Sequence, residues 1–209
     1  MKILIYGDSN SFGSKPNLDT YKKNGKEKVY NAEKLWWYAF AENNDLTINA
    51  LPGRCVCHEN KWLPKRNASK EISTDVCGFY ELAIFMLGTN DLKSEFSETS
   101  CREIAFEMTQ IIKKVKLMCG NPTIILISPP RVKEGTEVTD KYYQGAEEKS
   151  VELDWYYKNI AIYNGYHYVS GLEAEVGIDG EHLTTKGHKY IQEAVLKKCK
   201  EITSVYENC

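Results

Sequence analysis

Five residues of this sequence are of the types that acyl transfer requires: Ser9, Gly53, Asn90, Asp179 and His182. A serine hydroxyl becomes an effective nucleophile when a base removes its proton. A histidine, whose unperturbed pKa is about 6.5, can be that base near neutral pH. Asp179 precedes His182 by three residues, so its carboxylate can accept from the imidazole and stabilise the imidazolium. We therefore expect Ser9, His182 and Asp179 to form a catalytic triad.

The same chemistry needs hydrogen-bond donors for the oxyanion of the tetrahedral intermediate. Three donors are expected to form this oxyanion hole: the backbone N–H of Ser9, the backbone N–H of Gly53 and the side-chain amide of Asn90. Losing one such donor costs about 3–4 kcal/mol in comparable sites.

Short apolar runs and longer amphipathic segments alternate along the chain, and the candidate residues follow the apolar runs. Strands are expected at 2–6, 46–51, 80–87, 122–128 and 166–170, and helices at 32–44, 101–118, 147–165 and 184–199. This alternation predicts an α/β fold in which helices cover both faces of a parallel sheet. Ligands bind such sheets at the carboxyl ends of the strands. Two long connections, 14–30 and 54–76, are expected to shape a site there.

Composition limits the function classes. The 209 residues predict a single domain, 1–209. A net charge of −2 gives no electrostatic sign of nucleic-acid binding. No apolar run reaches the roughly 20 residues of a membrane span, and the opening "MKILIYGDS" is too short for a signal peptide. We expect a cytoplasmic protein that binds neither nucleic acid nor membrane.

The seven scattered cysteines are expected to be free thiols. Cys55, Cys57 and His58 could supply half of a zinc site, but no second close pair of ligands accompanies them. We expect no metal and no cofactor.

Four sequence blocks resemble those of the SGNH (GDSL-like) hydrolase family. They are "GDSN" with Ser9, the glycine Gly53, "LGTND" with Asn90, and "DGEH" with Asp179 and His182, in the family's order. The stretches "LPGR", "MLGTNDLK", "ISPP" and "DGEHLT" are most similar to the arylesterase and carbohydrate-acetylesterase branch. The resemblance implies a three-layer α/β/α sandwich with a five-stranded parallel, flavodoxin-like sheet. It also implies a carboxylic ester hydrolase that acts through an acyl-enzyme.

The chain departs from the family at two places. Asn10 stands where the first block usually has leucine, and "RCVCHE" follows the second-block glycine where the branch commonly has hydroxyl residues. Arg54, Asn10 and Trp62 are therefore candidate substrate-binding residues. The expected substrate is a small-molecule or carbohydrate ester with a short acyl group. The many aromatic residues are compatible with a homo-oligomer.

Other residues could take the proposed roles. His58 lies in the long second connection and could contact substrate, His167 lies in a predicted strand, and His188 is expected to point away from the start of the last helix. Glu181 is directly adjacent to His182, and adjacent side chains seldom face each other. His182 and Asp179 therefore remain the expected pair.

Structural roles compete with catalytic ones near the other blocks. Ser9 alone could be a helix cap, and Asn90 alone could be a turn residue. Asp8 is expected to accept backbone N–H bonds and hold the turn beside Ser9. Asp91 is expected to hold the loop that presents Asn90.

Three further functions stay open. The same triad would serve an acyltransferase, a thioesterase or a lysophospholipase. A nucleotide-binding protein is disfavoured because "GDSNSFG" lacks both the three-glycine spacing and the P-loop lysine. The third alternative is a non-catalytic ligand-binding α/β domain.

Overall fold

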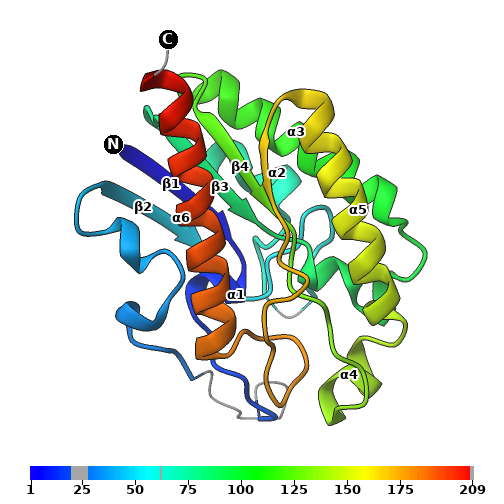
Figure 1. Ribbon diagram of the computed structural model, residues 1–209. Coiled ribbons are helices and arrows are strands. Elements are labelled where there is room, and N and C mark those ends of the chain that lie inside the picture. The colour runs from blue at the N-terminus through cyan, green and yellow to red at the C-terminus, as the bar shows by residue number, and fades with distance from the viewer. Residues whose placement is uncertain (20–27, 62, 208–209) are drawn as a thin grey trace.

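Five parallel strands form the central sheet of the protein (Figure 1). The structure is a computed structural model that describes residues 1–19, 28–61 and 63–207. The strands are β1 (Lys2–Gly7), β2 (Asp45–Ala50), β3 (Leu82–Met86), β4 (Thr123–Ile127) and β5 (His167–Val169). Their order across the sheet is β2-β1-β3-β4-β5, and every neighbouring pair is parallel. The predicted α/β fold and all five predicted strands are confirmed, with ends that differ by a few residues.

Helices cover both faces of this sheet. The longer ones are α2 (Ala68–Asp75), α3 (Cys101–Met118), α5 (Ala146–Asn164) and α6 (Thr185–Glu207), and the short ones are α1 (Ser9–Phe12) and α4 (Glu137–Tyr142). Because strand side chains alternate between faces, Leu4 and Tyr6 pack with α2, α3 and α5, whereas Ile3 and Ile5 pack with α6. This arrangement is the expected three-layer sandwich. None of these helices, within the described ranges, has both the length and the apolar composition needed to cross a membrane.

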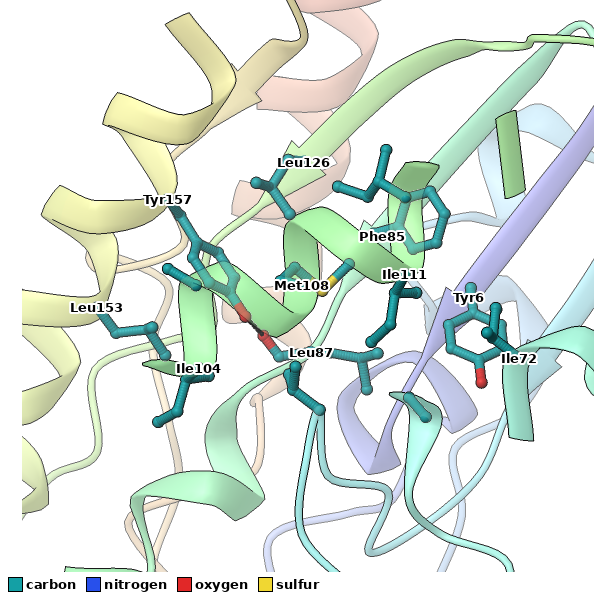
Figure 2. Close-up of a cluster of buried hydrophobic side chains, with 14 of the residues drawn as sticks. Tyr6, Ile72, Phe85, Leu87, Ile104, Met108, Ile111, Leu126, Leu153 and Tyr157 are labelled. Carbon is teal, nitrogen blue, oxygen red and sulfur yellow. Dashed lines mark hydrogen bonds between the residues drawn. The ribbon is translucent and has the colours of Figure 1, made fainter. Parts of the chain in front are cut away.

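The apolar layer beneath α3 and α5 also fixes the loop that carries Asn90 (Figure 2). The Tyr157 hydroxyl of α5 donates to the backbone carbonyl of Leu87, just after β3, at 3.2 Å. Gly88 follows with φ at 126°, and a Cβ there would lie 2.8 Å from Cδ2 of Leu153. Only glycine is compatible with both this backbone conformation and this close packing. The core therefore positions the Asn90 turn.

The helix predicted at 32–44 is wrong. The segment forms two short 3₁₀ helices, Ala32–Lys34 and Tyr38–Phe40. Trp36 and Phe40 pack against the sheet, and the indole N–H of Trp37 donates to the backbone carbonyl of Ser11 at 2.8 Å. The four-residue spacing of the two buried rings is that of a helix, but the ring contacts with distant residues stabilise a different backbone.

The long connection expected at 54–76 contains a helix, α2, that the sequence analysis did not predict. Asn67 caps this helix by accepting a hydrogen bond from the N–H of Lys70. Only Ala68 and Ile72 of the helix are buried, so its apolar pattern is too sparse to recognise. The helix α4 was missed for a similar reason, and α6 extends beyond the predicted end at residue 199.

Candidate active site

Asp179 and His182 form a buried pair in the loop before α6. Oδ2 of Asp179 lies 2.9 Å from Nδ1 of His182, and the two residues are 0% and 3% exposed. Oδ2 also accepts the backbone N–H of Asn17 at 2.6 Å, and Oδ1 accepts those of Glu181 at 3.3 Å and His182 at 3.1 Å. The carboxylate is thus fixed by the surrounding backbone. Since Nδ1 donates to it, the neutral imidazole carries its free lone pair on Nε2.

Burial shifts the pKa values of His182 and Asp179 in one direction, and neighbouring charges and hydrogen bonds shift them in the other. Burial lowers the pKa of His182, but the carboxylates of Glu181, Asp179 and Asp8 outweigh it and raise that pKa to about 9. Burial acts to raise the pKa of Asp179, yet the hydrogen bonds it accepts, above all from His182, leave that pKa below its ordinary value. The imidazole of His182 is therefore a stronger base than an unperturbed histidine, whose pKa of about 6.5 was assumed in the sequence analysis.

Ser9 stands immediately beyond the carboxyl end of β1, as the first residue of α1. Its neighbour Asp8 caps that helix, with Oδ1 accepting the backbone N–H of Asn10 at 2.9 Å. Asp8 thus holds the turn, as the sequence predicted, and burial raises the pKa of its carboxyl to about 7. Ser9 itself is 5% exposed. Its hydroxyl makes no hydrogen bond to His182, and both residues lie within the described part of the chain.

Asn10 brings the Ser9 segment and the His182 segment together. Its side-chain Nδ2 donates to the backbone carbonyl of Glu181 at 3.2 Å, and its Oδ1 accepts the backbone N–H of Leu183 at 2.9 Å. The residue is only 1% exposed. Both ends of its amide bind the protein itself, an arrangement that favours a structural role for Asn10 over the expected contact with substrate.

The two remaining predicted oxyanion donors lie after β2 and β3. Gly53 has φ at 73°, a left-handed conformation that favours glycine, and its carbonyl accepts from Nδ2 of Asn60 at 3.1 Å. Nδ2 of Asn90 donates to the backbone carbonyl of Arg54 at 3.1 Å, which ties the two loops together. Among the described residues, no acceptor binds the backbone N–H of Ser9 or of Gly53.

Asp91 holds the loop that follows Gly53. Its carboxylate accepts the backbone N–H of Val56 at 2.7 Å and that of Cys57 at 3.1 Å, and it lies 2.8 Å from Nδ1 of His58. The other ring nitrogen of His58 lies 2.9 Å from Oγ1 of Thr99. Both nitrogens of His58 are thus engaged by the protein, so this histidine stabilises the loop and is not available to a substrate.

Arg54 is a buried residue whose contacts favour a structural role over the expected contact with substrate. Its side chain is 1% exposed, and its guanidinium stacks on the ring of Tyr6 at 4.1 Å. It donates to the backbone carbonyls of Gly7 at 3.0 Å and Asn49 at 2.6 Å, and it pairs with Asp75 at 3.1 Å. Arg54 thereby joins the ends of β1 and β2. The third candidate substrate residue, Trp62, lies outside the described residues.

Glu181 was dismissed at the sequence level, but it faces His182. Its Oε1 lies 3.7 Å from Nδ1 of His182, and its other carboxylate oxygen accepts a hydrogen bond from the hydroxyl of Tyr143. Glu181 is 2% exposed. An acidic residue directly before the histidine in a buried loop is the only sequence signal that could have indicated this contact.

Two clusters in the described ranges bring three potential metal ligands within 4.8 Å of one another. One contains Cys57, His58 and Asp91, and the other contains Asp179, Glu181 and His182. In each cluster the imidazole already pairs with a carboxylate, so a metal would have to displace that hydrogen bond. The expectation of a metal-free site remains a prediction.

Known proteins match this chain by structure but not by sequence. No protein-family model and no curated protein matches the chain by sequence. Est24, a carbohydrate acetylesterase from Sinorhizobium meliloti, superposes with a TM-score of 0.83 at 24% identity, covering 96% of this chain and 99% of that one. The aryl esterase of M. smegmatis superposes with a TM-score of 0.82 at 22% identity, covering 96% and 98%.

The chain has the fold of these esterases. A lipolytic protein of the G-D-S-L family from Veillonella parvula is a more distant match, with a TM-score of 0.64 at 15% identity over 94% of this chain and 97% of that one. The near-complete coverage of both chains agrees with the three-layer sandwich that the sequence pattern predicted.

Proposed function

We propose that this protein is a serine esterase of the SGNH (GDSL-like) hydrolase family that hydrolyses short-chain acyl esters. The observation that carries the proposal is the buried Asp179–His182 pair, held against the segment of Ser9 by the side chain of Asn10. The sequence blocks of the family and the fold shared with an acetylesterase and an aryl esterase support the same conclusion.

In the first half-reaction, Oγ of Ser9 attacks the acyl carbon and its proton passes to Nε2 of His182. The bond to the leaving alcohol then breaks, and His182 returns the proton to the alcohol oxygen, which leaves an acyl-enzyme on Ser9. Asp179 accepts from Nδ1 at 2.9 Å, so it stabilises the imidazolium that exists between these two proton transfers.

In the second half-reaction, a water molecule loses a proton to Nε2 of His182 and attacks the acyl-enzyme. The bond between Oγ and the acyl carbon breaks, Ser9 regains its proton and the acid departs. The oxyanion of both tetrahedral intermediates would bind the backbone N–H groups of Ser9 and Gly53 and the amide of Asn90. Two of these donors have no other acceptor within the described ranges, so binding the oxyanion breaks no existing hydrogen bond of theirs.

Acetyl esters are the proposed substrates, because one similar structure is of a carbohydrate acetylesterase. The Ser9→Ala variant tests the proposal with p-nitrophenyl acetate as substrate. We expect kcat/KM to fall by at least about a thousandfold, and we expect labelling by a fluorophosphonate probe to disappear. Wild-type activity or undiminished labelling in this variant would exclude Ser9 as the nucleophile. A series of p-nitrophenyl esters from acetate to octanoate measures the acyl length that the site accepts.

A further inference from the structure

The side chain of Asn10 has an arrangement that leucine, the usual residue at this position of the family, could not provide. Asn10 directly follows Ser9 in α1 and is 1% exposed. Its backbone N–H donates to Oδ1 of Asp8 at 2.9 Å, so the backbone that carries the side chain is itself fixed. The amide therefore extends from a rigid part of the fold.

The two hydrogen bonds of this amide lie on either side of His182. Nδ2 donates to the carbonyl of Glu181 at 3.2 Å, and Oδ1 accepts the N–H of Leu183 at 2.9 Å. These two groups belong to the residues immediately before and after His182. One side chain thus fixes the backbone of His182 relative to the backbone of Ser9.

Asp179 and Asn10 hold different parts of the same histidine. Asp179 binds the ring at Nδ1 and the N–H of His182 itself, and it belongs to the same loop as the histidine. Asn10 belongs to the segment of Ser9, 171 and 173 residues away from its two partners. The Asn10 contacts therefore tie the backbone on both sides of His182 directly to the residue that follows Ser9, whereas the bond from the N–H of Asn17 reaches His182 through the carboxylate of Asp179.

We propose that Asn10 is a positioning residue that fixes the backbone of His182 beside that of Ser9, so that the imidazole can receive the serine proton when substrate is bound. The proposal rests on the proposed function, since it assigns Asn10 a role in the reaction of Ser9 and His182. A displacement of about 1 Å between reacting groups can reduce the rate about a hundredfold. Losing the Asn10 contacts is therefore expected to lower kcat while leaving substrate binding largely unchanged.

The test compares two variants with the wild type on p-nitrophenyl acetate. Asn10→Leu introduces the usual family residue and removes both hydrogen bonds. Asn10→Asp fills the same space and retains the acceptor for the N–H of Leu183, but it loses the donor to the carbonyl of Glu181. We expect kcat to fall about ten- to a hundredfold for Asn10→Leu and by a smaller factor for Asn10→Asp, with KM within about threefold of wild type.

Asn67→Leu is the matched control. Asn67 is also buried, at 3% exposure, and its amide also binds two backbone groups, the carbonyl of Cys57 and the N–H of Lys70. Its loss is expected to lower the melting temperature with kcat within about twofold of wild type. Melting curves of all variants identify the temperature at which each is folded, and kinetics are measured below it.

The outcomes separate this proposal from the proposed function. If Ser9→Ala is inactive but folded Asn10→Leu has wild-type kcat, the positioning role is overturned and the esterase remains. An equal loss of kcat in Asn67→Leu also overturns it, because the effect is then general to buried amides. If Asn10→Leu does not fold, the near-isosteric Asn10→Asp decides, and an unchanged kcat in that variant counts against the proposal. An active Ser9→Ala variant overturns the proposed function itself.

Discussion

Oε1 of Glu181 lies 3.7 Å from Nδ1 of the directly adjacent His182. Neighbouring side chains face each other here because Asp179 accepts both of their backbone N–H groups, which turns the chain tightly around one carboxylate. The hydroxyl of Tyr143, at the end of α4, donates a hydrogen bond to Glu181 and holds it in place. His182 consequently lies between two carboxylates, and its basicity follows from that arrangement.

The first prediction concerns the pH profile of the wild type. Burial lowers the pKa of His182, but the surrounding carboxylates, Glu181 first among them, raise it to about 9. The basic form that accepts the serine proton therefore predominates only above that pH. We expect kcat/KM for p-nitrophenyl acetate to rise with pH, to reach half of its maximum near pH 9 and to level off above that pH. A plateau of kcat/KM reached already at pH 7 would contradict the elevated pKa of His182 and support the ordinary histidine pKa assumed in the sequence analysis.

The second prediction isolates the charge of Glu181. Glu181→Gln keeps the shape of the side chain and an oxygen that accepts from Tyr143, but it removes the negative charge beside His182. The kinetic pKa should fall by about one pH unit, so that the variant gains relative activity at pH 7. Glu175→Gln is the control, because Glu175 is an exposed glutamate close in sequence to the same loop. Its carboxylate pairs with Lys186 and not with His182. Equal pH profiles for Glu181→Gln and the wild type would exclude this influence.

The third prediction concerns His188 and acid stability. His188 is fully buried, has no hydrogen-bond partner among the described residues and packs edge-on against Tyr30. Burial, with a smaller contribution from His182, lowers its pKa to about 4. Since the unfolded chain binds a proton near pH 6.5 and the folded chain does not, stability is retained above pH 6.5 and lost as the pH falls to about 4.

The loss attributed to His188 is on the order of 3 kcal/mol. The variant His188→Phe keeps an aromatic ring and cannot be protonated, so it should reduce the difference in unfolding free energy between pH 7 and pH 4.5. Urea unfolding at the two pH values measures this. An undiminished difference in the variant would assign the acid sensitivity to other groups.

The fourth prediction concerns Arg54 as a buried cation. Arg54→Met removes the guanidinium donor to the carbonyls of Gly7 and Asn49, although Gly7 still accepts the N–H of Leu51, and it removes the ion pair with Asp75. We expect the free energy of unfolding to fall by about 3 kcal/mol, with no change in KM of the folded variant. Arg131→Met is the control, since the side chain of Arg131 is 41% exposed and lies 3.5 Å from Glu173. Such an ion pair is expected to contribute less than about 1 kcal/mol. A raised KM with an unchanged free energy of unfolding would instead support a contact between Arg54 and the substrate.

The sequence predicted the sheet and α3 well because their signals are local. Continuous apolar runs mark the buried strands, and α3 matches its predicted range of 101–118 because its stripe of Ile104, Met108 and Ile111 has helical spacing. The segment 32–44 also has this spacing, yet it forms two 3₁₀ helices, and the indole of Trp37 donates to the carbonyl of the distant Ser11. No local pattern contains that contact.

The same distinction applies to the candidate site. Asp179 and His182 are three residues apart, and their pairing could be predicted from that spacing. The roles of Asn10 and Arg54 could not, because the partners of Asn10 lie 171 and 173 residues away and one partner of Arg54 lies 47 residues away. A polar residue in a polar loop gives no sign of whether it contacts a substrate or the protein.

The hydrogen bonds of Asn10 to residues 181 and 183 also order the maturation of the protein during translation. The ribosome makes Asn10 before either of its partners, because these lie 171 and 173 residues further along the chain. Under the proposed function, a nascent chain therefore carries the nucleophile before the base has been synthesised. We expect a chain released before residue 183 to lack both the base's anchoring and esterase activity.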